Sequence, residues 1–468
     1  MSTVPDSCQQ IVVDVQSRKR SAREIADDAL ARAAKFQDQY RAFIRMTPEI
    51  AQAQARQVDE RVKAGEKLPL AGVPFAVKDV FDMRGVPTTF GSKVFADRVA
   101  KADGTAVKKL VAAGGVCLGK LNLHECAFGF TGENRNHGNS RNPWDPERIP
   151  GGSSSGSAIA VALGICPLTL GSDTGGSIRM PSALCGLTGL KPTYGRISRA
   201  GGMPLSWTMD HVGPITRTAA EAALALREFA GPDPADETAS RRAVPDYPAD
   251  ISARIRGLRV GVMHEWFFRS LDPEVAGAVT KGIEKIVSLG ARQVEVHLPS
   301  LEEVVGAHRA IIFSEASSFH RPWLVDRSQE FADEIRPLLL AGLFLPAVDY
   351  LDALRARRVI RREWAAVFEN IDVLVTPTTP VTATKFGETT ADVPGGPRPL
   401  VRAYLDLTLP FNFTGYPALS IPCGFSKAGL PIGMQLVGRP FSESVLLRAA
   451  HQYQQETDWH KRMPPAAA

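Results

Sequence analysis

The segment from Gly151 to Arg179 constrains the fold of this chain more than any other. It contains two loops rich in glycine and serine, one on each side of a short apolar run. The loops read Gly-Gly-Ser-Ser-Ser-Gly-Ser over residues 151–157 and Gly-Ser-Asp-Thr-Gly-Gly-Ser over residues 171–177. Glycine permits close backbone approaches that a Cβ atom forbids, and a serine hydroxyl can donate, accept or attack. The pattern favours a catalytic site over an ordinary packed helix.

The apolar run between the loops predicts a helix and a strand. Residues 158–166 are small and apolar, which is typical of a buried helix, and Ser155 or Ser157 is expected to cap it. Residues 167–171 read as a short buried strand, and a second helix is expected from Ile178. The two loops therefore lie at the ends of regular elements that can hold them still.

The turn between that strand and the second helix predicts an oxyanion hole. Consecutive backbone N–H groups in such a turn converge on an oxygen that gains negative charge during a reaction. Thr174, Gly175, Gly176 and Ser177 form the turn, and the Ser177 hydroxyl is placed to face the same point. Ser177 is therefore the predicted nucleophile.

A hydroxyl nucleophile needs a base, and the segment contains no histidine. Upstream, residues 72–77 form an apolar strand that ends at Lys78. Burial disfavours the charged ammonium form of lysine, so a lysine at a buried strand end can lose its proton near neutral pH. Lys78 is the predicted base, although a surface lysine at a strand end would give the same pattern.

Four stretches of the sequence resemble the amidase signature family of hydrolases. They are Val77-Lys78-Asp79, the two loops with Ile178 and Arg179, residues 186–193 (Gly-Leu-Thr-Gly-Leu-Lys-Pro-Thr) and residues 430–438 (Leu-Pro-Ile-Gly-Met-Gln-Leu-Val-Gly). The resemblance covers nearly the whole chain. It implies a Ser–cis-Ser–Lys triad in which Ser177 attacks, Ser153 bridges after a cis peptide bond, and Lys78 is the base. Ser153 and Ser177 are 24 residues apart, as in the family.

The resemblance also implies an α/β fold with one large domain, in which helices cover both faces of a central mixed sheet. We expect a single domain over residues 1–468 with four parts: an N-terminal helical part (1–65), a catalytic core (66–230), a variable substrate-shaping region (231–400) and C-terminal strands and a helix that complete the sheet (401–468). Alternating helical and strand patterns in the N-terminal third independently favour α/β.

Other side chains in the segment have supporting or competing interpretations. Asp173 and Arg179 are expected to form a buried pair that braces the oxyanion turn. Ser154 is expected to support the same site; it also fits G-x-S-x-G, but that motif needs a strand before the serine, and residues 145–150 (Asp-Pro-Glu-Arg-Ile-Pro) do not predict one.

Composition bounds the function classes. The 468 residues carry a net charge of +5, and no dense basic run with interleaved aromatics was recognised, so we expect no nucleic-acid partner. No apolar run reaches the roughly 20 residues of a membrane span. The six cysteines are scattered without a C-x-x-C pair, which is typical of reduced thiols in a cytoplasmic protein. His124, His137 and His211 fit no H-E-x-x-H spacing, so we expect polar groups around a pocket and neither metal nor cofactor.

The predicted reaction is hydrolysis of linear amides through an acyl-enzyme on Ser177, with a small-molecule amide or carbamate as substrate and a homodimer as a possible assembly. Two alternatives stay open: a carbamate, urea-type or hydrazide hydrolase with the same triad, and the glutaminase subunit of a tRNA-dependent amidotransferase complex. The apolar residues 338–345 predict either a hydrophobic substrate pocket or a packed helical hairpin, and the Gly/Pro-rich residues 385–400 predict a loop or lid.

Overall fold

Short buried strands that alternate with helices build an α/β structure, as predicted. The computed structural model describes residues 5–467. Its strands are β1 (Phe43–Met46), β2 (Pro74–Lys78), β3 (Val116–Leu121), β4 (Leu168–Asp173), β5 (Thr188–Lys191), β6 (His211–Thr216), β7 (Arg259–Val262), β8 (Arg292–Glu295), β9 (Val373–Pro377), β10 (Thr390–Val393), β11 (Gly396–Pro399), β12 (Ala418–Phe425) and β13 (Pro431–Gly438). Its α-helices are α1 (Cys8–Gln16), α2 (Ala22–Tyr40), α3 (Pro48–Lys63), α4 (Thr105–Ala112), α5 (Ser155–Ala162), α6 (Arg179–Cys185), α7 (Ala219–Phe229), α8 (Tyr247–Asp250), α9 (His264–Phe267), α10 (Pro273–Ser288), α11 (Leu301–Asp326), α12 (Arg336–Ala341), α13 (Ala347–Phe368), α14 (Leu400–Thr414) and α15 (Glu443–Gln455).

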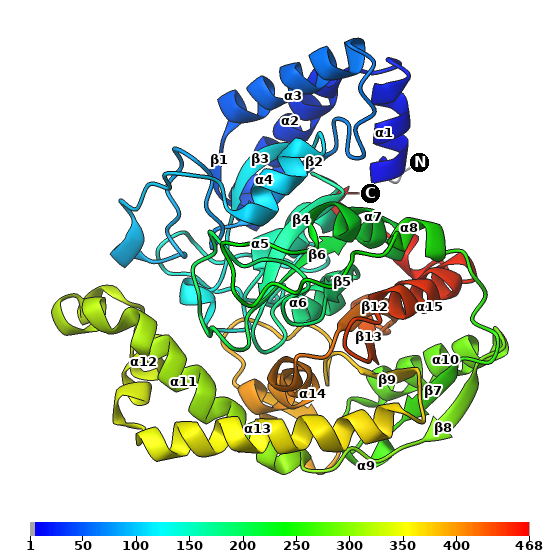
Figure 1. Ribbon diagram of the computed structural model, residues 1–468. Helices are drawn as coiled ribbons and strands as arrows, with labels where there is room; N and C mark the ends of the chain where they lie inside the picture. Colours follow the sequence, from blue (N-terminus) through cyan, green and yellow to red (C-terminus); the bar gives the residue numbers. More distant parts are fainter. Residues whose placement is uncertain (1–4, 468) are drawn as a thin grey trace.

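One mixed sheet of 11 strands runs through the described residues in the order β1-β3-β2-β4-β6-β5-β12-β13-β9-β7-β8. β2 is parallel to both β3 and β4, whereas β6, β5, β12, β13 and β9 follow one another antiparallel. Helices flank the sheet, with α1, α2 and α3 at one end of the molecule and α11 and α13 at the other (Figure 1). This single α/β domain is the predicted fold.

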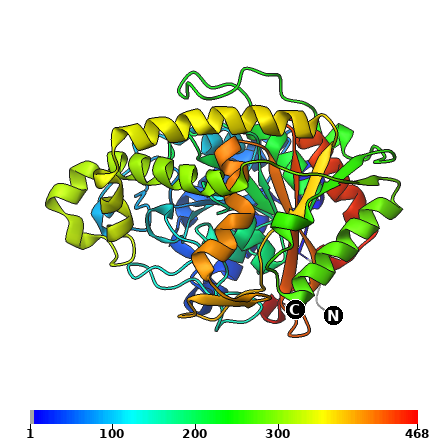
Figure 2. The ribbon, with the colours of Figure 1, turned by 90° about the horizontal axis from the view of Figure 1, so that it is seen from below.

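The sheet is joined in its middle by the last two strands of the chain. β12 pairs with β5 from the N-terminal half, and β13 pairs with β9 from the later half. α14 precedes this β-hairpin and crosses α11 and α13 (Figure 2). The hairpin and α14 therefore bring residues from the C-terminal part of the chain to the catalytic segment.

Local sequence signals set several element boundaries correctly. Ser21 and Glu24 form a capping box at the start of α2, and the Asp272 carboxylate caps α10. The helix after the first glycine-serine loop differs from the prediction, because it begins at Ser155 and ends at Ala162. Ser155 and Ser157 lie inside this helix and donate to the Ser140 hydroxyl and the Leu170 carbonyl, so neither caps it.

Two predictions for the region after residue 300 meet the structure differently. The segment predicted as a loop or lid over residues 385–400 contains an antiparallel hairpin of β10 and β11. Of the two alternatives for residues 338–345, the structure shows the helical hairpin, in which α11 packs against α12 and α13. Phe344 is 83% exposed on this hairpin, so it does not line an enclosed pocket.

No single helix within residues 5–467 has both the length and the apolar character needed to cross a membrane. Residues 336–344 and 347–368 meet the length and composition criteria only when taken as one pair, and that pair is bent by 96°.

Candidate active site

Lys78 occupies the buried end of β2 at the centre of the sheet. Its side chain is fully buried, and its Nζ lies 2.7 Å from Ser153 Oγ and 2.8 Å from Ser172 Oγ. Burial lowers the pKa of Lys78 from 10.5 to about 7, although the carboxylates of Asp173 and Asp210 favour the charged form. The lysine is thus available as a neutral amine close to physiological pH.

Ser153 begins the segment that carries Lys78's influence toward Ser177. The peptide bond between Gly152 and Ser153 is cis, as the family resemblance implied. Ser153 is fully buried, and its carbonyl accepts a hydrogen bond from the His124 backbone. The next residue, Ser154, donates its backbone N–H to the Ser177 carbonyl over 3.2 Å.

The three predicted triad residues are therefore brought together, but by unequal contacts. Lys78 and Ser153 share a direct side-chain hydrogen bond, whereas Ser153 and Ser177 are linked within residues 5–467 only through the neighbouring backbone contact. Ser177 is 6% exposed, so a substrate approaching it leaves bulk water.

The turn from Thr174 to Ser177 offers backbone donors at the nucleophile. The N–H of Gly176 is already used, because it donates to Asp173 Oδ1 over 2.8 Å. Within the described chain, the N–H groups of Thr174, Gly175 and Ser177 have no protein acceptor. The predicted oxyanion hole is thereby narrowed to these three donors, with Gly176 shaping the turn. Gly176 has a φ of +137°, which favours glycine.

Asp173 and Arg179 form the predicted buried pair below this turn. Arg179 Nη2 lies 2.9 Å from Asp173 Oδ1 and Arg179 Nε lies 3.0 Å from Oδ2, with both side chains fully buried. Burial alone would raise the pKa of Asp173, but the neighbouring guanidinium holds it well below its usual range. The carboxylate also accepts the backbone N–H of Ile178, so it fixes both ends of the turn.

α14 and β13 complete the brace from the far end of the chain. Asn412 donates to both the carbonyl and the carboxylate of Asp173, over 2.9 and 2.7 Å. Gln435 accepts a hydrogen bond from Arg179, and the Thr408 hydroxyl donates to the Gly175 carbonyl over 2.5 Å. Sequence analysis missed these contacts, because they depend on how distant elements pack.

Ser154 supports the site from the side. Its hydroxyl donates to the Ser172 carbonyl over 3.1 Å and accepts the Ser172 N–H over 3.3 Å, which ties the first loop to β4. No strand runs directly into Ser154, so the structure lacks the element that a hydrolase elbow at G-x-S-x-G needs.

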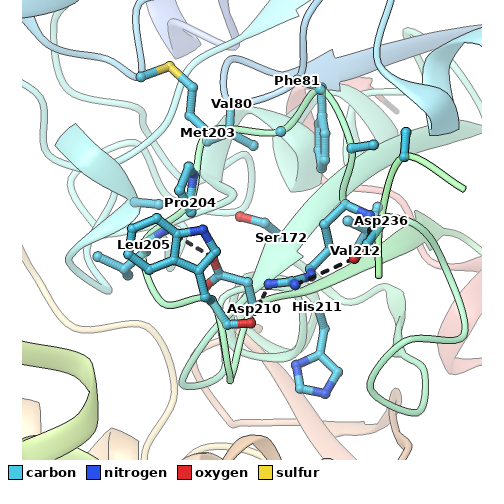
Figure 3. Close-up of a pocket in the computed structure, with 17 residues that line it drawn as sticks. Val80, Phe81, Ser172, Met203, Pro204, Leu205, Asp210, His211, Val212 and Asp236 are labelled. Atoms are coloured by element: carbon cyan, nitrogen blue, oxygen red, sulfur yellow. Dashed lines mark hydrogen bonds and ion pairs between the residues drawn. The ribbon is translucent and has the colours of Figure 1, made fainter. Parts of the chain in front are cut away.

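A cavity of about 230 Å³ opens beside Ser172 (Figure 3). Asp210 and His211 lie at its floor, and Phe81, Trp207 and Arg199 contribute to its walls. Asp210 accepts hydrogen bonds from the Thr174 hydroxyl and from two backbone N–H groups, at Leu205 and Ser206. Burial raises the pKa of Asp210 to about 6.

Ser172 and Asp210 are site residues that sequence reasoning overlooked. Ser172 lines this cavity and contacts Lys78, so it connects the cavity to the base, whereas Ser177 is not among the cavity's lining residues. The period-two pattern of β4 was the available signal, but using it required knowing that β4 lies parallel to β2.

The three histidines weighed as metal ligands lie apart in function. His124 contacts Thr131, His137 contacts Thr89, and His211 contacts the Met209 carbonyl. Within residues 5–467 no group of three or more His, Cys, Asp or Glu side chains is arranged to hold a metal ion.

A buried lysine, a serine bound to it and a second serine beside free backbone donors define a serine hydrolase that acts on carbonyl compounds. A family model described as Amidase matches residues 24–447, and the chain belongs to this family, the amidase signature enzymes. It is thus an amidase-family hydrolase of carbon–nitrogen bonds.

Three known proteins illustrate the relationship. A subunit of the glutamyl-tRNA(Gln) amidotransferase from Roseiflexus sp. (strain RS-1) is 43% identical over 465 residues, or 94% of each chain. A solved structure described as an unexpected vestigial protein complex, which reveals the evolutionary origins of an s-triazine catabolic enzyme, is 40% identical with a TM-score of 0.92, covering 96% of this chain and 98% of that one. A bacterial aryl acylamidase of the amidase signature family is 25% identical with a TM-score of 0.89, covering 98% of each chain.

These relatives correct the prediction about partners. We predicted a small-molecule amide or carbamate substrate, no nucleic acid, no membrane and a possible homodimer. The similar proteins are instead named as one subunit of an amidotransferase that acts on glutamyl-tRNA(Gln). The prediction was wrong because it rested on net charge and on the lack of a recognised basic run, and both describe composition without showing where charges gather.

Proposed function

We propose that this chain hydrolyses a carboxamide through an acyl-enzyme on Ser177, with Ser153 as the bridging hydroxyl and Lys78 as the base. The observation that carries the proposal is the Lys78 amine, which is fully buried and 2.7 Å from Ser153 Oγ. A buried amine with a pKa of about 7 can take up and return a proton at neutral pH.

The proposed reaction has two halves. Lys78 accepts a proton from Ser153 while Ser153 accepts one from Ser177, and Ser177 Oγ then forms a bond to the amide carbon. The carbon–nitrogen bond breaks as the proton returns through Ser153 to the leaving nitrogen, which departs as ammonia. Water attacks the resulting ester, Lys78 and Ser153 again transfer the proton, and the carboxylic acid and free Ser177 are released.

The turn supplies the proposed stabilisation of the negative oxygen. The N–H groups of Thr174, Gly175 and Ser177 have no protein acceptor within residues 5–467, so they are free to donate to that oxygen. Donors fixed in advance do not have to reorganise during the reaction. Asp173 and Arg179 support the proposal by holding both ends of the turn.

We further propose that the amide is that of glutamine and that the chain is the glutaminase subunit of a tRNA-dependent amidotransferase complex. This alternative is favoured over a free-standing amidase because similar proteins across 94% or more of the chain bear that subunit's name. A cytoplasmic location follows from the same proposal. The division into parts at residues 65, 230 and 400 is likewise kept as a proposal.

Ammonia release by the purified chain tests this function. We expect release from L-glutamine, with none from the Ser177→Ala variant. Aliphatic amides, aryl amides and biuret serve as comparison substrates. Ammonia from biuret or an aryl amide but not from glutamine, in a sample that loses activity on Ser177→Ala, would contradict the glutaminase proposal while keeping the hydrolase.

A further inference from the structure

A second cavity, of about 600 Å³, lies against α13 and is lined by arginines. Arg357, Arg358, Arg361 and Arg362 line it together with Tyr194 and Thr208. These four arginines repeat at a spacing of one helical turn, so they share one face of α13. The basic run Arg355-Ala356-Arg357-Arg358-Val359-Ile360-Arg361-Arg362 encodes this face and was overlooked in the sequence.

The arginines of this face are not neutralised by protein carboxylates. Within residues 5–467, none of the four has a carboxylate oxygen within 4.0 Å, although 25 such ion pairs occur elsewhere. The acidic side chains of α13 that lie nearby have other partners, since Glu363 accepts the Ser300 hydroxyl and Asp352 pairs with Arg355. The cavity is thus strongly electropositive.

Arg357 is the anchor of the cluster. It is 8% exposed, and its Nε is buried without any hydrogen-bond partner in the described chain, while Nη2 donates to the Thr208 carbonyl over 2.6 Å. A buried guanidinium with an unused donor is costly unless an acceptor arrives. Glu315 is close, but its carboxylate already accepts hydrogen bonds from Thr208 and Tyr350.

The spacing and surroundings of the arginines favour phosphates of a nucleotide chain. Arg357 and Arg358 form one pair and Arg361 and Arg362 a second, about 6 Å further along the helix axis. Guanidinium groups match phosphate oxygens in two-point contacts. Trp207, 43% exposed, directly precedes Thr208 and offers a ring on which a base can stack, which an acidic peptide does not require.

We propose that this arginine cavity binds neighbouring phosphate groups of a ribonucleotide chain, with a base stacked on Trp207. The proposal rests on the proposed function, because tRNA is the nucleic acid in the name of the similar subunits. Trp207 lines the first cavity and Thr208 lines the second, so the bound chain would lie beside the entrance to the catalytic site.

Fluorescence anisotropy with a labelled single-stranded RNA oligomer and the full chain tests the proposal. Arg361→Gln with Arg362→Gln should weaken binding roughly tenfold and reduce the slope of log K against log salt by about 1.4, since each lost phosphate contact contributes about 0.7 for single strands. The matched control is Arg254→Gln with Arg256→Gln, which removes the same charge from exposed arginines outside the cavity. This control should leave both quantities near wild type.

A second pair of measurements separates nucleotide recognition from simple charge attraction. Trp207→Ala should weaken RNA binding several-fold, within the roughly 1–3 kcal/mol of one stacked base, and leave binding of inorganic tripolyphosphate unchanged. Thermal unfolding of each variant confirms that it is folded.

Three results would overturn the proposal: RNA binding equal in wild type and the cavity variant, equal losses in the cavity and control variants, or a glutamate-rich peptide that competes with RNA and shows the same dependence on Arg361 and Arg362. Wild-type chain that hydrolyses glutamine but binds no RNA would overturn this inference alone. RNA binding without glutamine hydrolysis would overturn only the proposed function.

Discussion

At the scale of single residues, the site depends on where one amine is buried. Lys78 is held by two hydroxyls, from Ser153 and Ser172, and its two nearest charged influences are the carboxylates of Asp173 and Asp210. Desolvation lowers its pKa more than these carboxylates raise it. The pH dependence of the reaction therefore reports directly on this small group of side chains.

Wild-type kcat/KM should rise with pH around a midpoint near 7, because Lys78, whose pKa is lowered to about 7, acts only after losing its proton. Asp210→Asn removes a negative charge that favours the ammonium form, so the midpoint should move to lower pH. Initial rates from pH 5 to 9 measure this. Asp458→Asn, an exposed substitution, is the control, and an unmoved midpoint in Asp210→Asn would contradict the electrostatic argument.

Ser172→Ala tests the second hydroxyl on Lys78. The substitution removes a hydrogen bond of 2.8 Å, and one such bond contributes about 0.5–1.5 kcal/mol, so kcat should fall roughly tenfold with KM little changed. Steady-state kinetics give both parameters. Ser317→Ala removes a buried hydroxyl of α11 that donates to Leu339, and should leave kcat unchanged. Wild-type kcat in Ser172→Ala would show that Ser153 alone positions the lysine.

At the scale of elements, α14 acts as a support for the catalytic turn. It contributes Thr408 to the Gly175 carbonyl and Asn412 to Asp173, although more than 220 residues separate these partners. Met180 and Thr408 also pack where a Cβ atom on Gly176 would lie. The turn is thus shaped from outside its own sequence.

Thr408→Val should lower kcat at least tenfold, because it leaves the Gly175 carbonyl without its donor and frees the turn that carries the proposed oxyanion donors. Thr414→Val is a matched control on the same helix, since that buried hydroxyl donates to the Pro410 carbonyl and not to the turn. Both variants should lose about 1 kcal/mol of stability. Equal kcat values in the two variants would rule out a specific role for Thr408.

The elements that the sequence predicted well are those with local causes. The capping box at Ser21, the Asp272 cap and the strand ending at Lys78 each depend on residues within a few positions. The contacts of Ser172, Asn412 and Gln435 were not predictable, because they depend on strand order and on helix packing. The hairpin at residues 390–399 was obscured by its glycines and prolines, which also occur in loops.

At the scale of the whole molecule, one buried ion pair connects distant parts of the chain. Asp173 at the end of β4 is held by Arg179 of α6 and Asn412 of α14, and Arg179 in turn contacts Gln435 of β13. Every member of this network is buried, so each polar group depends on the others for its hydrogen bonds.

Asp173→Asn should destabilise the protein by about 3–5 kcal/mol, because it leaves the buried Arg179 guanidinium without a countercharge. Urea unfolding followed by circular dichroism measures the free energy of unfolding. Asp352→Asn, which breaks an exposed pair with Arg355, should change stability little. A loss in Asp173→Asn no larger than in that control would show that the network is not a stabilising one.

The position of the C-terminal hairpin also governs how the chain can mature during synthesis. Strands β12 and β13 separate β5 from β9, so a nascent chain that has emerged only to residue 415 holds two part-sheets with open edges at those strands. Unpaired edges invite contacts with other chains. Gln435 is also still inside the ribosome at that stage, and Arg179 lacks its acceptor. The enzyme becomes competent only after translation is nearly complete, which makes premature hydrolysis by unfinished chains unattainable.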